Sequence, residues 1–501
     1  MLISRRGVLI SGASSLALGA TPAPFSVEEQ SVATLQAALT ARRITSVDLV
    51  SLYTQRIERL DRRGPALQSV LALNPEAVAI ARALDDERTR TGPRGPLHGI
   101  PVLLKDNLDT ADQQLTTAGS RALLDAPAPK RDAAVVARLR AAGAVLLGKT
   151  NLSEWANLRG RNSTSGWSAR GGLTKNPYVT TRNPSGSSSG SAVAVAASLC
   201  AVAVGTETDG SIVSPASVCG VVGFKPTLGR VPTQGVLPLA HSQDTVGPLA
   251  RSVADAAVLF EVLAGADPRD PVRATPPSLE GVRLGVVRRL VDANWHVAPV
   301  AREALAAMQA AGATLVDVEL SSDAYEAAEL EVLLFELQAD LGAYLAARGG
   351  PLASLADVVA FNRAHADAEL GFFGQQLFED ALTRGPLSSP AYRAALATCA
   401  QARRDLEGLI QTHHLDALVA PTGSPAWLTD FVHGDPPAFS FSTPAAVAGW
   451  PHLTVPMGFV GELPVALSFV GPAFSDHAVL RLGAAFESLT HARKAPRYFT
   501  R

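Results

Sequence analysis

The 501-residue sequence has few of the features that mark disulfide-stabilised or nucleic-acid-binding proteins. It contains only three cysteines, too few and too scattered for a disulfide framework or a thiolate zinc site, although a pairing of Cys200 with Cys219 stays open. Charged residues make up only 18%, and 44 Lys and Arg against 46 Asp and Glu give a net charge of −2. Because the chain lacks a basic excess, we expect neither a nucleic acid nor an anionic membrane as a partner.

Long apolar runs are also missing. No segment of about 20 unbroken apolar residues occurs, so we expect no stable membrane association of the mature protein. Residues 1–25 carry Arg5-Arg6 before a short, weakly apolar stretch, which is typical of a twin-arginine export signal. The alternative is a tail that stays attached. The first interpretation predicts an exported protein, periplasmic or secreted.

Apolar residues make up 47% of the sequence, which is enough for a large core. Short apolar runs, which read as buried strands, alternate with segments of helical spacing, and this order predicts an α/β fold. The runs are 100–104, 144–147, 193–204, 282–287 and 415–420. Residues 453–460 and 463–470 flank Gly461-Glu462 and predict an antiparallel hairpin, so the sheet should be mixed. Residues 322–400 are helical in pattern and lie between strand-like regions, as a helical cap over a site would.

Residues 143–150 match the phosphate-binding pattern G-x-x-x-x-G-K-[ST]. Such a loop needs a polar, flexible segment that follows a strand and precedes a helix. Here a helical pattern precedes Gly143, and the four residues between the glycines are apolar. The order is therefore inverted, and nucleotide binding is disfavoured.

Residues 186–190 match G-x-S-x-G, the nucleophile turn of α/β-hydrolases, with Ser188 at its centre. That turn requires an apolar strand directly before it and an acid and a histidine further along the chain. The preceding residues 178–185 are polar and contain a proline. We regard Ser188 as a weaker nucleophile candidate for this reason.

A third interpretation takes residues 184–227 as a whole. Two turns rich in serine and glycine, 185–191 and 205–211, bracket an apolar segment, and backbone amides in such turns can hold an oxyanion. A serine there needs a base, and Lys105, which follows an apolar run, can supply one if burial keeps its amine uncharged. Taken singly, serine-rich turns are usually ordinary loops and lysines are usually solvated.

Together these segments resemble the amidase-signature family of serine hydrolases. The resemblance extends from about residue 30 to 498 and includes HGIPVLLKDN at 98–107, GAVLLGKTNLSEWAN at 143–157, the signature at 184–227 and LTVPMG at 453–458. It implies one large domain over residues 26–501, with a mixed sheet covered by helices on both faces. A set of motifs of this length is far more specific than any one of them.

The resemblance also implies a Ser-cisSer-Lys triad. Ser211 matches the nucleophile, Ser187 the bridging serine after a cis peptide bond with Gly186, and Lys105 the base. The oxyanion amides fall on Thr208, Asp209, Gly210 and Ser211. Ser188 and Thr206 match positions that assist the triad by hydrogen bonds, although stabilising a turn is an equally good interpretation. Neither a metal nor an organic cofactor is implied.

The sequence departs from the common signature at Ser185, Ser189, Glu207 and Asp209. A carboxylate at 209 would oppose an oxyanion unless it points away or pairs. GTETDGS and residues 153–172 are nevertheless similar to bacterial peptide amidases, as is the helical segment 322–400, which should shape specificity. The expected function is hydrolysis of the C-terminal carboxamide of peptides or amino acid amides with release of ammonia. Alternatives are a broader aliphatic or aryl amidase and a non-catalytic exported binding protein, whereas a tRNA-linked role is disfavoured by the export signal. Oligomeric state stays open.

Overall fold

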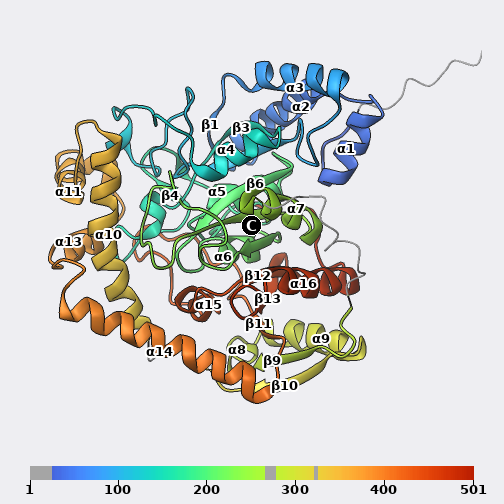
Figure 1. Cartoon of the computed structure of the whole chain (residues 1–501), viewed down its shortest axis with the longest axis vertical. Helices are drawn as coiled ribbons and strands as arrows, with labels where there is room; N and C mark the ends of the chain where they lie inside the picture. The colour runs from blue at the N-terminus through green and yellow to red at the C-terminus, as the bar shows by residue number, and fades with distance from the viewer. Residues whose placement is uncertain (1–24, 266–277, 321–324, 501) are drawn as a thin grey trace, which may run out of the picture.

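The computed structural model describes residues 25–265, 278–320 and 325–500. Residues 1–24, almost the whole predicted export signal, lie outside this range. The described residues contain an 11-stranded mixed sheet in the order β1-β3-β2-β6-β8-β7-β12-β13-β11-β9-β10, which runs through the middle of the molecule (Figure 1). Its strands are β1 (Val70–Leu73), β2 (Pro101–Lys105), β3 (Val145–Thr150), β6 (Val202–Glu207), β7 (Val222–Lys225), β8 (Thr245–Ala250), β9 (Arg283–Val287), β10 (Thr314–Val318), β11 (Ala417–Pro421), β12 (His452–Val460) and β13 (Leu463–Val470). A small separate pair is formed by β4 (Trp167–Ser168) and β5 (Gly172–Leu173).

Helices flank the sheet, so the predicted α/β fold with a single mixed sheet is confirmed. Short helical turns are η1 (Ile57–Arg62), η2 (Arg121–Leu123) and η3 (Glu154–Asn157). The helices outside the segment 322–400 are α1 (Val32–Thr40), α2 (Ser46–Arg56), α3 (Ala77–Thr91), α4 (Ala134–Ala141), α5 (Ser189–Ala196), α6 (Val213–Val218), α7 (Val253–Ala264), α8 (Arg288–Val291), α9 (Val297–Ala310), α15 (Thr443–Ala448) and α16 (Asp476–Thr490).

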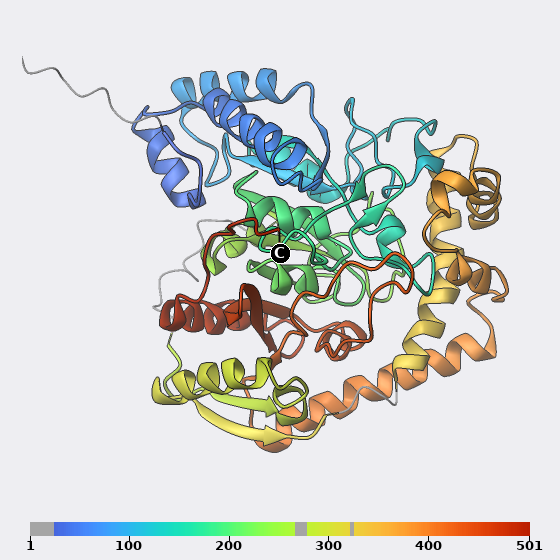
Figure 2. The same cartoon turned by 180° about the vertical axis from the view of Figure 1, so that it is seen from behind.

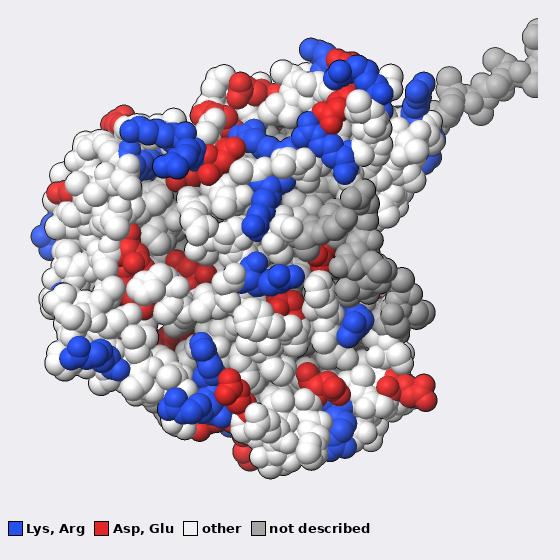
Figure 3. All heavy atoms as spheres, viewed as in Figure 1, with Lys and Arg blue, Asp and Glu red and all other residues white. Residues whose placement is uncertain are grey.

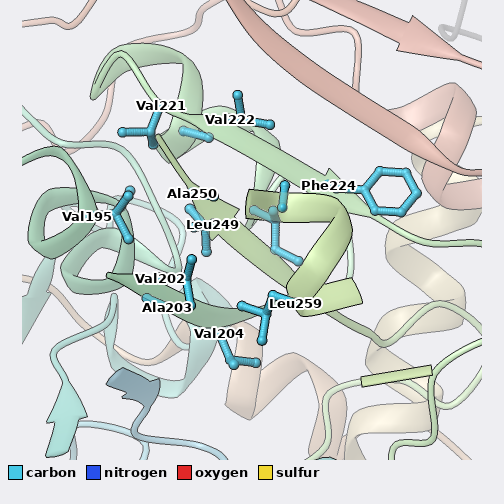
Figure 4. Close-up of a cluster of buried hydrophobic side chains, with 14 of the residues drawn as sticks. Val195, Val202, Ala203, Val204, Val221, Val222, Phe224, Leu249, Ala250 and Leu259 are labelled. Carbon is cyan, nitrogen blue, oxygen red and sulfur yellow. The ribbon is translucent and has the colours of Figure 1, made fainter. Parts of the chain in front are cut away.

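The central strands are buried on both faces and have almost no polar side chains except at their ends. Val202, Val204 and Leu249 from β6 and β8 pack with Leu259 of α7 and with residues of β7 in one continuous core (Figure 4). Strands covered on both faces need apolar residues at every position rather than at alternate ones. This explains why their sequences appear as uninterrupted apolar runs.

Four of the five apolar runs do form strands, β2, β3, β9 and β11, and the predicted hairpin is β12 paired with β13. The run 193–204 was wrong as a single strand. Its first part belongs to helix α5, and only its last residues enter β6. Both halves are fully buried, and complete burial removes the polar face that would otherwise distinguish a helix from a strand.

The segment 322–400 is helical over its described part, as predicted. It consists of α10 (Glu326–Arg348), α11 (Leu355–Ala364), α12 (Ala366–Glu369), α13 (Gln376–Leu382) and the start of α14 (Pro390–His413). Figures 1 and 2 show α10, α11 and α13 along one side of the molecule and α14 leading back toward β11. This side has its own apolar core, in which Leu337 and Leu341 of α10 pack with Trp155 and Phe378.

The surface and the helices agree with the expectations from composition. Basic and acidic side chains are interspersed over the face in Figure 3, without a large area of one sign. Among the described helices, none is both long and apolar enough to cross a membrane. The three cysteines are buried and free, so Cys200 and Cys219 are not paired.

Candidate active site

Three chain segments meet at the ends of two neighbouring strands. β2 ends at Lys105, and β6 ends at Glu207 before the turn 208–211. The two strands are parallel, with Leu104 opposite Val204, so that Lys105 comes beside Thr206. Helix α5 begins directly after Ser187 and Ser188. The carboxyl ends of parallel strands next to a helix N-terminus are a common location for ligand sites in α/β proteins.

Lys105 is completely buried, and all of its hydrogen-bond partners are uncharged. Its Nζ lies 2.8 Å from Ser187 Oγ, 2.8 Å from Thr206 Oγ1 and 3.0 Å from the Thr206 carbonyl oxygen. Burial lowers the pKa of Lys105 to about 7, against the opposing charges of Asp244 and Glu207. An amine with this pKa is substantially uncharged near neutral pH.

Ser187 follows a cis peptide bond with Gly186, as the sequence predicted. A Cβ on Gly186 would lie 2.1 Å from Ser153 Oγ, so any larger residue would force the Ser153 side chain to move. The carbonyl of Ser187 accepts a hydrogen bond of 3.1 Å from the amide of Ser153, which fixes the turn against the loop after β3. Ser187 itself is fully buried.

Ser188 and Thr206, the two residues expected to assist the triad, form hydrogen bonds with each other, and Thr206 also does so with other residues of the site. Ser188 Oγ donates to the Thr206 carbonyl at 3.1 Å and accepts from the Thr206 amide at 3.2 Å. Thr206 Oγ1 also accepts from Asn107 Nδ2 at 2.9 Å. Sequence analysis assigned no role to Asn107, although it lies in the same motif as Lys105. Ser188 thus ties the first turn to β6, while Thr206 contacts the lysine directly.

The turn 208–211 lies against the first turn. The amide of Ser188 donates to the carbonyl oxygen of Ser211 at 3.0 Å, which makes residues 188 and 211 close neighbours in space. Gly210 has φ +76°, and a Cβ there would meet Ser214 Oγ at 2.9 Å and Ser442 Oγ at 3.0 Å. Ser211 retains 8% exposure. Of the two serines, 211 is therefore the one that a ligand can reach more easily.

Glu207 fixes the end of this turn. Its Oε2 accepts from the amides of Ile212 and Val213 at 2.6 and 3.0 Å, where α6 begins. Burial raises the pKa of Glu207, while the nearby charge of Lys225 opposes that shift. In the sequence Glu207 stood out only as a departure from the common signature, and its pairing with amides five and six residues away has no local signal.

Asp209 accepts a hydrogen bond from another segment of the chain. Its Oδ2 accepts from Thr443 Oγ1 of α15 at 2.7 Å. Burial raises the pKa of Asp209, and hydrogen bonds from Ser442 and Thr443 oppose this shift. The Thr443 hydroxyl group orients the Asp209 carboxyl group but does not cancel its charge, and it lies more than 230 residues along the chain.

Thr208 is held by a residue that sequence analysis missed. Its Oγ1 donates to Asp244 Oδ1 at 2.6 Å, and Asp244 Oδ2 accepts from the amides of Leu239 and Ala240 at 2.8 and 3.1 Å. Burial raises the pKa of Asp244 to about 6. Nothing in the local sequence around Asp244 signals this role, because its partner lies 36 residues away.

A cavity of about 90 Å³ adjoins the two turns. Ser185, two residues before Ser187, and Ser214, which approaches Gly210, both line it. Its wall combines hydroxyl groups with two aromatic rings, those of Trp427 and Phe439. The cavity can take an apolar group with hydrogen-bonding atoms at its edge.

The two competing motifs have structural roles. Residues 143–150 form a turn and strand β3, and Lys149 is buried with its Nζ donating to the Leu108 carbonyl at 2.7 Å. No strand precedes Gly186 directly, since β5 ends at Leu173. Neither the phosphate-binding loop nor the α/β-hydrolase turn is therefore present.

Comparisons with known proteins agree with this geometry. The family described as Amidase matches residues 48–480. A probable amidase from Arabidopsis thaliana is 38% identical over 99% of this chain and 97% of its own. The structure of native peptide amidase from Stenotrophomonas maltophilia is 48% identical with a TM-score of 0.88, covering 95% of this chain and all of its own. The structure of peptide amidase PAM with the competitive inhibitor chymostatin is 48% identical with a TM-score of 0.89, covering 94% and 99%.

The fold and these similarities define a hydrolase that acts on C–N bonds. The chain belongs to the amidase family, and its structure closely resembles that of peptide amidase.

Proposed function

We propose that this amidase hydrolyses the C-terminal carboxamide of peptides or amino acid amides and releases ammonia. Ser211 acts as the nucleophile, Ser187 as the bridging serine and Lys105 as the base. The observation that carries the proposal is the 2.8 Å hydrogen bond between the Lys105 amine and the Ser187 hydroxyl, both of which are fully buried. Similarity to peptide amidases supports the substrate class.

The partners of Lys105 suit an uncharged base. A neutral amine has two hydrogens and one lone pair, and Thr206 offers two acceptor oxygens at 2.8 and 3.0 Å. With its hydrogens directed there, the lone pair is free to accept the proton of Ser187. This arrangement makes Thr206 more than a turn residue, since it orients the base.

The reaction begins when Ser211 Oγ attacks the carboxamide carbon. Its proton passes to Ser187, whose own proton passes to Lys105, and the tetrahedral oxyanion is held by the amides of residues 208–211. Protonated Lys105 then returns a proton through Ser187 to the leaving nitrogen, and ammonia departs as the C–N bond breaks. Water attacks the acyl-enzyme by the same relay and releases the free carboxylic acid.

The cavity beside the two turns is the place we propose for the substrate side chain next to the carboxamide. It adjoins residues that flank both serines, and its aromatic wall with hydroxyl groups suits an apolar or modestly polar side chain. Helix α10 of the segment 322–400 contacts the loop that holds Thr208, through the hydrogen bond from Gln243 to Glu329. We further propose that residues 1–25 direct export of the protein to the periplasm or beyond.

The test is ammonia release from a dipeptide amide by the purified protein and by Ser211→Ala and Lys105→Ala. We expect activity only in the unchanged protein, with mass spectrometry locating a serine-directed acylating inhibitor on Ser211. Equal activity of all three proteins would refute the triad, and an adduct on Ser188 would favour the α/β-hydrolase-like alternative. Turnover of simple aliphatic or aryl amides with no turnover of peptide amides would favour the broader amidase. No turnover of any amide would favour a non-catalytic binding protein.

A further inference from the structure

The turn 208–211 is joined to helix α10 by buried polar side chains. Gln243 Nε2 donates to Glu329 Oε1 at 2.7 Å, and the same nitrogen lies 3.4 Å from the Thr208 carbonyl oxygen. Gln243 and Glu329 are 4% and 6% exposed. One amide group therefore contacts both the turn and the helix.

Glu329 also lies beside Asp209 of the turn: burial, and then the neighbouring carboxyl group of Asp209, raise the pKa of Glu329. Asp209 in turn accepts from Thr443 on its other side. Two ionised carboxyl groups beside each other in a buried environment repel, so full ionisation of both is unfavourable. We therefore expect the pair to keep at least one proton.

The surroundings of the pair favour that proton. Glu326, on the same helix, and Tyr325 face the two carboxyl groups. The negative charge of Glu326 opposes full ionisation of the pair Asp209 and Glu329. Lys225 of β7 is the basic group that faces Asp209, and Cys399 of α14 lies near Glu329. Burial and the neighbouring carboxyl groups raise the pKa values of both Asp209 and Glu329.

The neighbouring residues of the 239–244 loop strengthen the same junction. His241 Nδ1 lies 2.9 Å from Asp340 Oδ2, and the Ser242 amide donates to Glu336 Oε2 at 3.0 Å. Asp340 and Glu336 both belong to α10. The loop that holds Thr208 through Asp244 is thus attached to the helix by consecutive residues.

We propose that Glu329 is a positioning residue for catalysis: through a proton shared with Asp209 and a hydrogen bond from Gln243, it holds the turn 208–211 against helix α10. This inference rests on the proposed role of that turn as the oxyanion site. Glu329 touches neither the substrate nor the reacting atoms. It sets the direction of the amides, and the shared proton leaves the pair with one negative charge fewer near the oxyanion.

Replacement of Glu329 by glutamine and by leucine tests whether the hydrogen bonds of residue 329 hold the turn. Glutamine can donate to Asp209 and accept from Gln243, as a protonated carboxyl group does, whereas leucine has a similar volume and can do neither. Because removing one oxyanion donor lowers kcat by about 10²–10³-fold, misdirecting the turn should lower kcat by at least about tenfold. We expect Glu329→Gln to keep kcat within about threefold, and Glu329→Leu to lose it with little change in KM.

The matched control is Glu331→Gln on the same helix. Glu331 forms an ion pair with Arg384, with 2.7 Å between nitrogen and oxygen, and this pair is not part of the junction with the turn. This variant should therefore keep both kcat and KM. Thermal unfolding of each variant shows whether it remains folded at the assay temperature. The double variant with Glu329→Leu and Gln243→Leu should lower kcat no more than the more harmful of the two single changes, because both residues act through one junction.

The result that would overturn the inference is a Glu329→Leu enzyme with normal kcat. An equal loss in Glu329→Gln and Glu329→Leu would also overturn it, since an ionised carboxylate would then be what the site requires. Losses of Gln243→Leu and Glu329→Leu that simply multiply in the double variant would argue against one shared junction. These results are distinct from failure of the proposed function, in which Ser211→Ala would retain activity.

Discussion

The pH dependence of the reaction follows from the position of Lys105. Its amine is fully buried and has only uncharged hydrogen-bond partners, so burial lowers its pKa to about 7. The base is the uncharged amine, which exists above this pKa and disappears as the pH falls through it. We therefore expect kcat/KM to be high at pH 8 and to decline toward acid.

The size of the decline follows from the same pKa. About half of the lysine is uncharged at pH 7, and each further unit of acidity lowers the uncharged fraction about tenfold. Near pH 5 the enzyme should therefore retain on the order of 1% of its plateau kcat/KM. Asp244 titrates near pH 6 and contributes a negative charge that raises the pKa of Lys105. In Asp244→Asn the decline should persist but move to lower pH.

The assay is ammonia release from a peptide amide at subsaturating concentration between pH 5 and 9, with circular dichroism at each pH to show that the fold is intact. Lys105→Arg is the matched control, because a guanidinium group keeps its charge and cannot accept a proton in this range. It should be inactive at every pH. A kcat/KM of the unchanged protein that stays constant from pH 8 to pH 5 would refute an uncharged lysine as the base.

Three further outcomes test the same structure. Ser187→Ala should lower kcat by about 10²–10⁴-fold, the usual range for a proton-transfer group, and near-normal turnover would remove this serine from the relay. Gly186→Ala should lower the free energy of unfolding by about 1–3 kcal/mol, because the added carbon meets Ser153 at 2.1 Å; an unchanged Tm would contradict this packing. Arg159→Leu should cost about 3–5 kcal/mol in urea unfolding, since it removes the buried guanidinium group that contacts the carboxyl groups of Glu154 and Glu369, and a loss below about 1 kcal/mol would show that these contacts are not stabilising.

The sequence was sufficient for the fold class and for six strands of the 11-stranded sheet. The hairpin β12–β13 was predictable because its turn and its two apolar runs are adjacent in the chain. The run 193–204 was not, since full burial of both α5 and β6 hides the periodicity that separates helix from strand. Gly143 correctly indicated the end of α4, because a positive φ at that position favours glycine.

For the site, the motifs indicated the lysine, the two serines and the oxyanion turn as candidates, and the structure brings Lys105 to Ser187 and residue 188 to residue 211. The motifs could not indicate what holds these groups. Asp244 and Glu329 are ordinary acidic residues in the sequence, and their meaning comes from contacts with Thr208 and Gln243 that only folding creates.

The amino-acid sequence by itself determined which chemical groups are available and which local turns the chain can make. Glycine suits both turns, because a Cβ at residue 186 would crowd Ser153 and residue 210 has a positive φ. Tertiary structure alone decided how readily the buried lysine amines lose their charge. Lys105, Lys149 and Lys225 are all buried with lowered pKa values, and only Lys105 contacts Ser187. Burial and long-range neighbours set a proton's free energy, and neither is a local property of the chain.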